Sequence, residues 1–375
     1  MRFHHAGVKE EMVTRLRPLR IAALVGSVGI ASIGLGASAA SAEESGFTTR
    51  VFATGGTSHT NPDDITLLDG NIFVAWQNGI GSKGQPNVTV TDSTVIEYSR
   101  SGQTIHSWQL TGKVDGMSAD AEHSRIIATV NEDGNSSLYV ITLKDEGSQV
   151  THYTYSGLTH GGGTDAPHMY RGQLFITASA PDGTNPHEPA VYRATLSGTS
   201  AQLSPVLYDD SSATIANPGG GTASLALTDP DSNTVVPGSS PRFGHDFMLD
   251  SQGEGQLIFA RNAGTSSQSL FVLNLSPDSG PNSTVAVDDT AWATSSRGTL
   301  YATNGSSTVY AISGRFDVGT AFVAVSPNNA NVPPSPGVPS WLATLNLNNG
   351  ALSHVPGVSI NPKGLLFVAG ETSED

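Results

Sequence analysis

The sequence predicts an all-β fold, a single β-propeller of six or seven four-stranded blades, and three observations lead to this prediction. Short runs rich in Val, Ile, Phe, Tyr and Thr recur along the 375 residues, as is typical of strands. No stretch sustains the 3.6-residue apolar period of an amphipathic helix. Dipeptides typical of hairpin turns separate the runs, at Asp69-Gly70, Asn78-Gly79, Asp133-Gly134, Asn304-Gly305 and Asn349-Gly350.

Residues 1–42 have the organisation of a secretory signal peptide. Arginines up to Arg20 precede an apolar stretch from Ile21 to Leu35, and small residues follow up to Ala42. A membrane anchor is the alternative, but this stretch is short and interrupted by Gly and Ser. We therefore expect a secreted protein with a propeller domain over residues 43–375 and no membrane span in the mature chain.

The composition excludes several classes of protein. The leader holds five of the 18 Lys/Arg and two of the 33 Asp/Glu, which leaves 13 basic and 31 acidic residues in the mature chain and a net charge of −18. Such a charge argues against nucleic acid as a partner and favours solubility and attraction for cations. The chain has no cysteine, so disulfides, thiolate metal sites and cysteine nucleophiles are excluded.

The strongest apolar runs repeat at intervals of roughly 40 to 50 residues, as in propellers. They are NIFVAW, RIIATV, QLFITA, QLIFAR, TLYATN and GLLFVA, which begin at residues 71, 125, 173, 256, 299 and 364. The third and fourth runs are further apart, and we assign the excess, residues 209–243, to an insertion or a degenerate blade. Residues 319–355 resemble one more blade that has lost strands, so six and seven blades both stay open.

The two ends of the mature chain predict how the ring closes. Residues 47–55 form a lone strand ahead of the first full copy, and residues 357–370 begin a blade that they do not finish. If strands from both termini share a blade, no sheet edge is left exposed there.

The stretch NPDDITLLDGNIFVAWQN, residues 61–78, resembles an NHL-type repeat. The mature chain as a whole is similar to the secreted bacterial propellers of the gluconolactonase-like and streptogramin-lyase-like families. This resemblance implies a propeller fold, an activity as a hydrolase or lyase, and a metal ion held in the central channel.

An acidic residue precedes or opens the strong strand in most copies. The innermost strand of each blade lines the channel of a propeller, so these side chains are predicted to converge on the axis. Oxygen ligands suit Ca²⁺ or another divalent cation; in the alternative interpretation each carboxylate braces a turn. The predicted metal ligands are Asp64, Asp115, Asp165, Asp246 and Asp289.

Histidines lie beside the same acidic residues. His168 follows Asp165 by three positions and His245 precedes Asp246, and imidazole titrates near neutral pH. We predict His168 and His245 as catalytic acid/base residues, with His160 as a weaker candidate; the alternative is that they are ordinary loop residues.

Three further motifs are weaker indicators of function. HGGG at 160–163 occurs without the G-x-S-x-G elbow that a serine esterase needs. GIGSKG at 79–84 is not followed by a helix that could hold a pyrophosphate. TDPDSNT at 228–234 is predicted to be a polar β-turn at a hairpin tip, with a second calcium loop or the rim of a cleft as alternatives.

Together these observations favour a metal-supported hydrolase or lyase that acts on a small ester, lactone or sugar-like substrate at the channel mouth. The rival is a non-catalytic binding or scaffold propeller outside the cytoplasm. In both cases we expect a monomer with a small-molecule or carbohydrate-like ligand.

Overall fold

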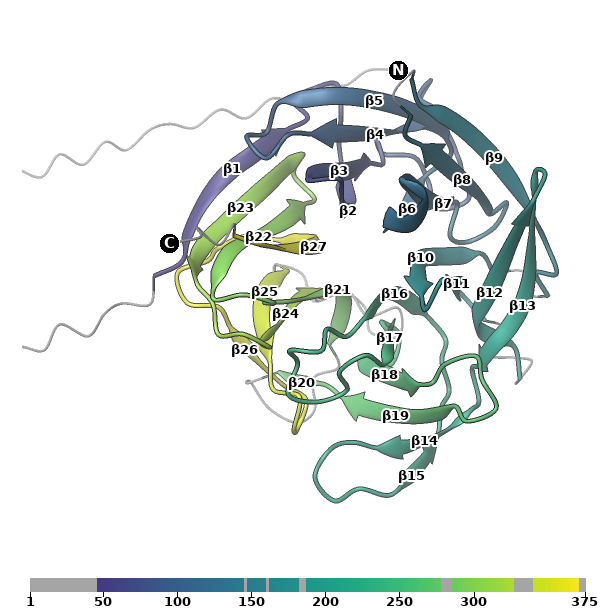
Figure 1. The fold of residues 1–375 in the computed structure, drawn as a ribbon, viewed down its shortest axis with the longest axis vertical. Coiled ribbons are helices and arrows are strands. Elements are labelled where there is room, and N and C mark those ends of the chain that lie inside the picture. The colour runs from purple at the N-terminus through teal and green to yellow at the C-terminus, as the bar shows by residue number, and fades with distance from the viewer. Residues whose placement is uncertain are drawn as a thin grey trace, which may run out of the picture. The chain divides into compact units, whose positions relative to one another are not determined.

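The computed structural model describes residues 46–144, 147–159, 162–181, 187–277, 285–326 and 340–370. The predicted leader and His160 lie outside these residues. One compact unit extends from Ser45 to Asp375, and within it the sheets surround a central axis (Figure 1). The described part consists of strands β1 to β27 and one 3-10 turn, η1 (Ala121–His123), which confirms the all-β prediction.

Three sheet units are meanders of consecutive antiparallel strands. One stands alone as a four-stranded sheet, and the other two are joined into an eight-stranded sheet because β13 runs parallel to β9. The first meander is β2 (Pro62–Leu68), β3 (Asn71–Trp76), β4 (Asp92–Tyr98) and β5 (Thr104–Thr111). The second is β6 (Val114–Asp120), β7 (Arg125–Val130), β8 (Ser137–Thr142) and β9 (Gln149–Ser156). The third is β10 (Thr164–Tyr170), β11 (Gln173–Ala178), β12 (Pro189–Ser197) and β13 (Ser200–Tyr208).

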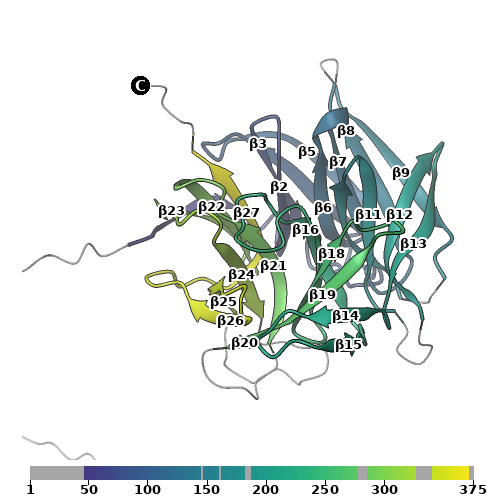
Figure 2. The ribbon, with the colours of Figure 1, turned by 60° about the horizontal axis from the view of Figure 1, so that its bottom comes forward.

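The fourth unit carries an added hairpin at its outer edge (Figure 2). Its meander is β16 (Pro230–Val235), β17 (Phe247–Ser251), β18 (Gln256–Arg261) and β19 (Ser269–Asn274), and the hairpin β14 (Ser212–Ile215) and β15 (Thr222–Ser224) pairs with β19. Residues 209–243 therefore contain both an edge addition and the innermost strand of a sheet. The predicted β-turn in TDPDSNT is wrong, because Pro230–Val235 is strand β16.

The last two sheets exchange strands along the chain. After β21 (Ala286–Trp292) the chain forms β22 (Arg297–Asn304) and β23 (Thr308–Arg315) of the next sheet, and only then returns to pair β24 (Ala321–Ser326) with β21. The sheet of β21 also contains β25 (Trp341–Leu345), β26 (Ala351–His354) and the short β20 (Ser276–Pro277). The sheet of β22 is completed by β1 (Thr48–Thr54) and β27 (Pro362–Ala369), in the order β1-β23-β22-β27. The first and last described strands thus share one sheet, and the strands over 319–355 obtain their inner partner from residues 286–292.

The second strands are buried on both faces because neighbouring sheets cover them. In β3, Phe73 packs in a cluster with Ile126 of β7, whereas Trp76 packs in another with Val309 of β23 and Val368 of β27. This two-sided burial explains why four of the six strongest apolar runs of the sequence are second strands, namely β3, β7, β11 and β22; QLIFAR is the third strand β18, and GLLFVA belongs to the innermost strand β27. The innermost strands instead turn one side to the axis and are free to carry polar residues.

The innermost strands are β2, β6, β10, β16, β21 and β27, and each contacts the next around the axis (Figure 1). Near its start each one departs from regular pairing with its neighbour, for example between Pro62 and Ile65 in β2. A bulge of this kind changes the direction of the side chains that it contains. The site is built on these six irregularities.

Candidate functional site

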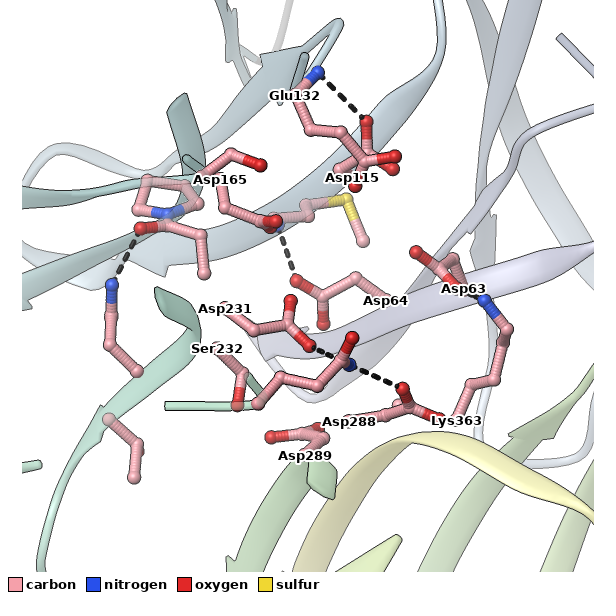
Figure 3. A pocket seen from close by; sticks show the side chains of 18 of the residues that line it. Asp63, Asp64, Asp115, Glu132, Asp165, Asp231, Ser232, Asp288, Asp289 and Lys363 are labelled. Carbon is pink, nitrogen blue, oxygen red and sulfur yellow. Dashed lines mark hydrogen bonds and ion pairs between the residues drawn. The ribbon is translucent and has the colours of Figure 1, made fainter. Parts of the chain in front are cut away.

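A cavity of about 810 Å³ lies where the six innermost strands begin. Carboxylates dominate its lining, and Figure 3 shows the labelled ones turned toward a common space. The acidic lining residues are Asp63, Asp64, Asp115, Glu132, Asp133, Asp165, Asp229, Asp231, Asp288 and Asp289; the basic ones are Lys113 and Lys363, with His168 in the wall.

Six of these side chains come from equivalent places, one at the bulge of each innermost strand. Five are aspartates and the sixth is a lysine: Asp63, Asp115, Asp165, Asp231, Asp288 and Lys363. We call these six residues the axial ring.

Two glutamines connect aspartates of neighbouring sheets. The Gln77 amide donates to Asp63 Oδ2 at 2.6 Å and to Asp115 Oδ1 at 3.1 Å. The Gln252 amide donates to Asp231 Oδ2 at 2.7 Å and to Asp288 Oδ1 at 2.8 Å. Each glutamine directly follows a second strand, β3 or β17. Neutral donors therefore hold two pairs of carboxyl groups together.

The two lysines neutralise only part of the acidic lining. Lys363 Nζ lies 2.8 Å from Asp63 Oδ1, and the negative charge of Asp63 raises the Lys363 pKa. Lys113 Nζ lies 2.5 Å from Asp115 Oδ1 and also contacts Glu132. Burial lowers the Lys113 pKa, but the negative charges of these two acids raise it by a larger amount. The Lys113 pKa is therefore above its ordinary value. Both lysines are thus charged at neutral pH.

Several carboxyl groups keep protons to unusually high pH. Burial, then repulsion from Glu132, raises the pKa of Asp229 to about 7. Burial raises the pKa of Asp288 to about 6 and that of Asp289 to about 7, and it raises the pKa values of Asp165 and Asp231 well above the ordinary range. A cation that entered the cavity would stabilise the charged forms and displace these protons.

Four of the five predicted metal ligands line the cavity, and two of these four brace the backbone. Asp64 accepts hydrogen bonds from the backbone N–H of Ile65, at 2.6 Å, and of Met117 in the next sheet. Asp289 accepts from the N–H of Thr290 and of Leu365 in the next sheet, both at 2.6 Å. Asp64 and Asp289 therefore join neighbouring innermost strands.

Asp246 and His245 do not line this cavity. They lie between β16 and β17, at the opposite end of this hairpin from Asp231, and Asp246 accepts hydrogen bonds from Arg261 at 3.3 Å. The sequence alignment placed QLIFAR with the second strands, whereas it is the third strand, β18. The predicted residue was therefore Asp246, which lies after the innermost strand β16. Asp231, which lies in β16, occupies the position expected of a cavity residue.

His168 does line the cavity, and burial lowers its pKa to about 4. Its imidazole is consequently neutral at pH 7 and adds no charge. His160, the weaker candidate, lies outside the described residues.

Sequence reasoning missed Asp63, Asp231, Asp288 and Lys363 of the axial ring. A signal for three of them was present, because a proline opens β2, β16 and β27 directly before the ring residue. Proline is tolerated at the first position of a strand. For Asp288 the signal was the Asp-Asp doublet that repeats the one at residues 63 and 64.

The described residues include neither a cluster of metal-ligating acids and histidines nor a membrane-spanning helix. None of their His, Asp and Glu side chains form a group of three or more in an arrangement that would hold a metal ion. Among the same residues no helix is long and apolar enough to cross a membrane.

The chain is similar in fold to a gluconolactonase and to other β-propeller proteins. The periplasmic gluconolactonase of Pseudomonas aeruginosa matches with 15% identity and a TM-score of 0.45, over 82% of this chain and 88% of that one. A Lactobacillus plantarum protein matches with 13% identity and a TM-score of 0.46, over 83% and 89%. A β-propeller domain from Myceliophteria thermophila matches with 10% identity and a TM-score of 0.38, over 79% and 84%. No protein-family model and no curated protein matches the chain.

Proposed function

We propose that the protein is a secreted, six-bladed β-propeller that binds a small cationic molecule bearing hydroxyl groups, such as an amino sugar, in its axial cavity. In this proposal β1 and β27 close the ring from the two termini. The observation that carries it is the axial ring, in which five aspartates and one lysine from all six innermost strands face one cavity.

The cavity suits a molecule larger than an ion. Its volume of about 810 Å³ is within the range of small-molecule pockets. Hydroxyl and amide side chains such as Ser118, Ser179 and Asn233 lie among the carboxylates. A ligand with an ammonium group and several hydroxyls would therefore find partners of both kinds.

The metal set predicted from the sequence does not fit one ion. Asp246 lies outside the cavity lining, and Asp64 and Asp289 use their oxygens on backbone N–H groups. A divalent cation held by other ring carboxylates is therefore included as a competing ligand in the experiment below.

The experiment is calorimetric titration of the mature protein with glucosamine, glucose, spermidine and CaCl₂. We expect glucosamine to bind at least ten times more tightly than glucose, because only glucosamine pairs a charge with the ring. Asp165→Asn and Asp231→Asn should weaken glucosamine binding, whereas Asp246→Asn removes the same charge outside the cavity and should not. Equal binding of glucose and glucosamine, or an equal effect of all three variants, would refute the proposal.

A hydrolase is the second candidate, and one observation favours it. Asp229 and Asp289, with pKa values of about 7, are acids that still hold protons near neutral pH, as a general acid must. The substrate would be a small ester, lactone or sugar-like molecule, with neutral His168 as a hydrogen-bonding group. Release of acid from gluconolactone, followed in a pH-stat, should fall at least tenfold in Asp229→Asn; no turnover by the unaltered protein would eliminate this candidate.

A further inference from the structure

A threonine supports the bulge of the innermost strand in three of the sheets. Thr129, Thr177 and Thr303 stand on the second strands opposite the bulges of β6, β10 and β27. Thr177 Oγ1 donates to the Asp231 carbonyl of the next innermost strand at 2.7 Å. Thr303 Oγ1 likewise donates to the Asp63 carbonyl at 2.5 Å. The threonine position thus faces main-chain oxygens at the joint between two sheets.

Asp250 occupies this position in the sheet of β16. The pairs Pro230 with Ser251 and Asn233 with Leu249 flank it, so Asp250 stands opposite the bulge that contains Ser232. The residue is 0% exposed. Neither of its carboxylate oxygens has a hydrogen-bond partner among the described residues. A carboxyl group has therefore replaced the hydroxyl donor of the other sheets at this position.

Three more oxygens without partners lie on the two adjoining innermost strands. They are Ser232 Oγ and Asn233 Oδ1 of β16 and Thr290 Oγ1 of β21, all buried and unpaired among the described residues. Strand β21 contacts both β16 and β17, so it forms the other side of this joint. Buried polar atoms almost always have a partner. Asn233 turns its amide to the Ala166 carbonyl of β10, so Asp250, Ser232 and Thr290 remain at this joint and indicate a missing positive group.

We propose that Asp250, with Ser232 and Thr290, binds a buried Ca²⁺ ion at the joint between the sheets of β16 and β21. An all-oxygen set with one carboxylate and neutral hydroxyl oxygens is the chemistry that a hard cation takes. Ca²⁺ accepts such irregular sets, whereas Mg²⁺ demands octahedral geometry and retains water. With one carboxylate the affinity should be weak, in the range of about 0.1–1 mM found in extracellular modules.

This site differs from the axial ring in residues and in role. Its carboxylate is Asp250, which is not among the residues that line the cavity. The ion would do between the sheets of β16 and β21 what the hydroxyls of Thr177 and Thr303 do at two other joints. Ser232 and Thr290 also line the axial cavity, so the two sites adjoin, but no residue of the axial ring is a ligand of the ion.

The test compares thermal unfolding of the wild type and of Asp250→Thr, which installs the hydroxyl of the other sheets. Chelator-treated protein is measured with no added metal, with 10 mM CaCl₂ and with 10 mM MgCl₂. We expect Ca²⁺ to raise the wild-type Tm by a few degrees and Mg²⁺ to raise it less. Asp250→Thr should show no response to Ca²⁺, with a Tm in chelator at least equal to that of the wild type.

Two more variants keep the result decisive. Thr290→Val should reduce the response to Ca²⁺ even if Asp250→Thr fails to fold. Asp165→Asn, in the axial ring, should keep the full response. A wild type that Ca²⁺ does not stabilise, or a response that Asp165→Asn loses and Asp250→Thr retains, would overturn the proposal, since Asp250 would then be a structural acid or the ion would lie in the cavity.

Discussion

At the scale of single residues, Gln77 and Gln252 show how the fold tolerates aspartates in a common cavity. Each amide donates to carboxylates of two neighbouring sheets. Such a donor stabilises the charged forms of the two acids, which would otherwise repel each other. The glutamines are thus part of the electrostatic design of the site, although neither carries charge.

Gln252→Ala tests this role. The variant leaves Asp231 and Asp288 without their shared donor, and we expect a loss of about 1.5–3 kcal/mol in the free energy of unfolding at pH 8. At pH 5 the loss should be smaller, because the carboxyl groups can then be protonated. Denaturant unfolding at the two pH values measures it, with exposed Gln149→Ala as the control; an equal loss at both pH values would assign the effect to packing.

Two residues of the axial ring, Asp115 and Asp165, were predictable from the strand assignment. Asp115 and Asp165 belong to the axial ring because the strand after each of them is a true second strand, β7 or β11. Asp246 was misplaced because FMLDS, the second strand β17, is short and contains Asp250, so its apolar signal was weaker than that of β18. Local apolar strength identifies buried strands, but it does not say which strand of a sheet each one is.

At the scale of elements, β14–β15 and β16 have opposite importance although they are neighbours in sequence. The hairpin β14–β15 adds to the outer edge of β19, whereas β16 contributes Asp231 and contacts β10 and β21. The sequence showed residues 209–243 as one irregular segment. It could not separate the two parts, because β16 carries a polar face toward the cavity and lacks the strong apolar run of a second strand.

Two linker replacements distinguish the contribution of the hairpin β14–β15 from that of β16. Replacing residues 212–224 with a short Gly/Ser linker should leave the fold intact and lower the Tm by only a few degrees, because an edge addition buries little of the core. Replacing residues 212–239 also removes β16 and should abolish cooperative unfolding. Circular dichroism melting distinguishes them, and a folded second variant would show that β16 is dispensable.

At the scale of the whole molecule, the chain order near the C-terminus fastens the last two sheets to each other. The chain leaves one sheet after β21, forms two strands of the next, and returns before β27 completes the second sheet. Turn and strand signals are local, so the sequence predicted that both termini contribute strands but not this exchange. The sheet of β21 is complete only after β26 and the sheet of β22 only after β27, so both depend on the C-terminal part of the chain.

Removal of β1 tests the contribution of the N-terminal strand. Deleting residues 46–55 exposes the edge of β23 and removes Phe52, which packs against Tyr98 and Tyr301. We expect a destabilised protein that associates through the free edge. Light scattering and a thermal scan would detect both effects, and a soluble monomer with an unchanged Tm would show that the strand is not needed.

The pH dependence of stability is a property of the whole acidic cavity. Asp229, Asp288 and Asp289 have folded-state pKa values of about 7, 6 and 7, above the ordinary 3.8. Between about pH 4 and 7 the folded protein therefore holds protons that the unfolded chain has released. Stability is full below this window and falls as the pH rises through it, which is opposite to ordinary acid denaturation.

We accordingly expect the ligand-free protein to melt several degrees higher at pH 5 than at pH 7.5, in a chelator-containing buffer of constant ionic strength. Asp229→Asn should flatten this profile because it removes one of the titrating groups, whereas Asp246→Asn, outside the cavity, should not. A cationic ligand should flatten it too, since a bound cation stabilises the ionised carboxylates and replaces the protons. A Tm that rises steadily from pH 5 to 7.5 without ligand would mean that the carboxylates are already charged in the folded protein, and with it the electrostatic account of the cavity would fail.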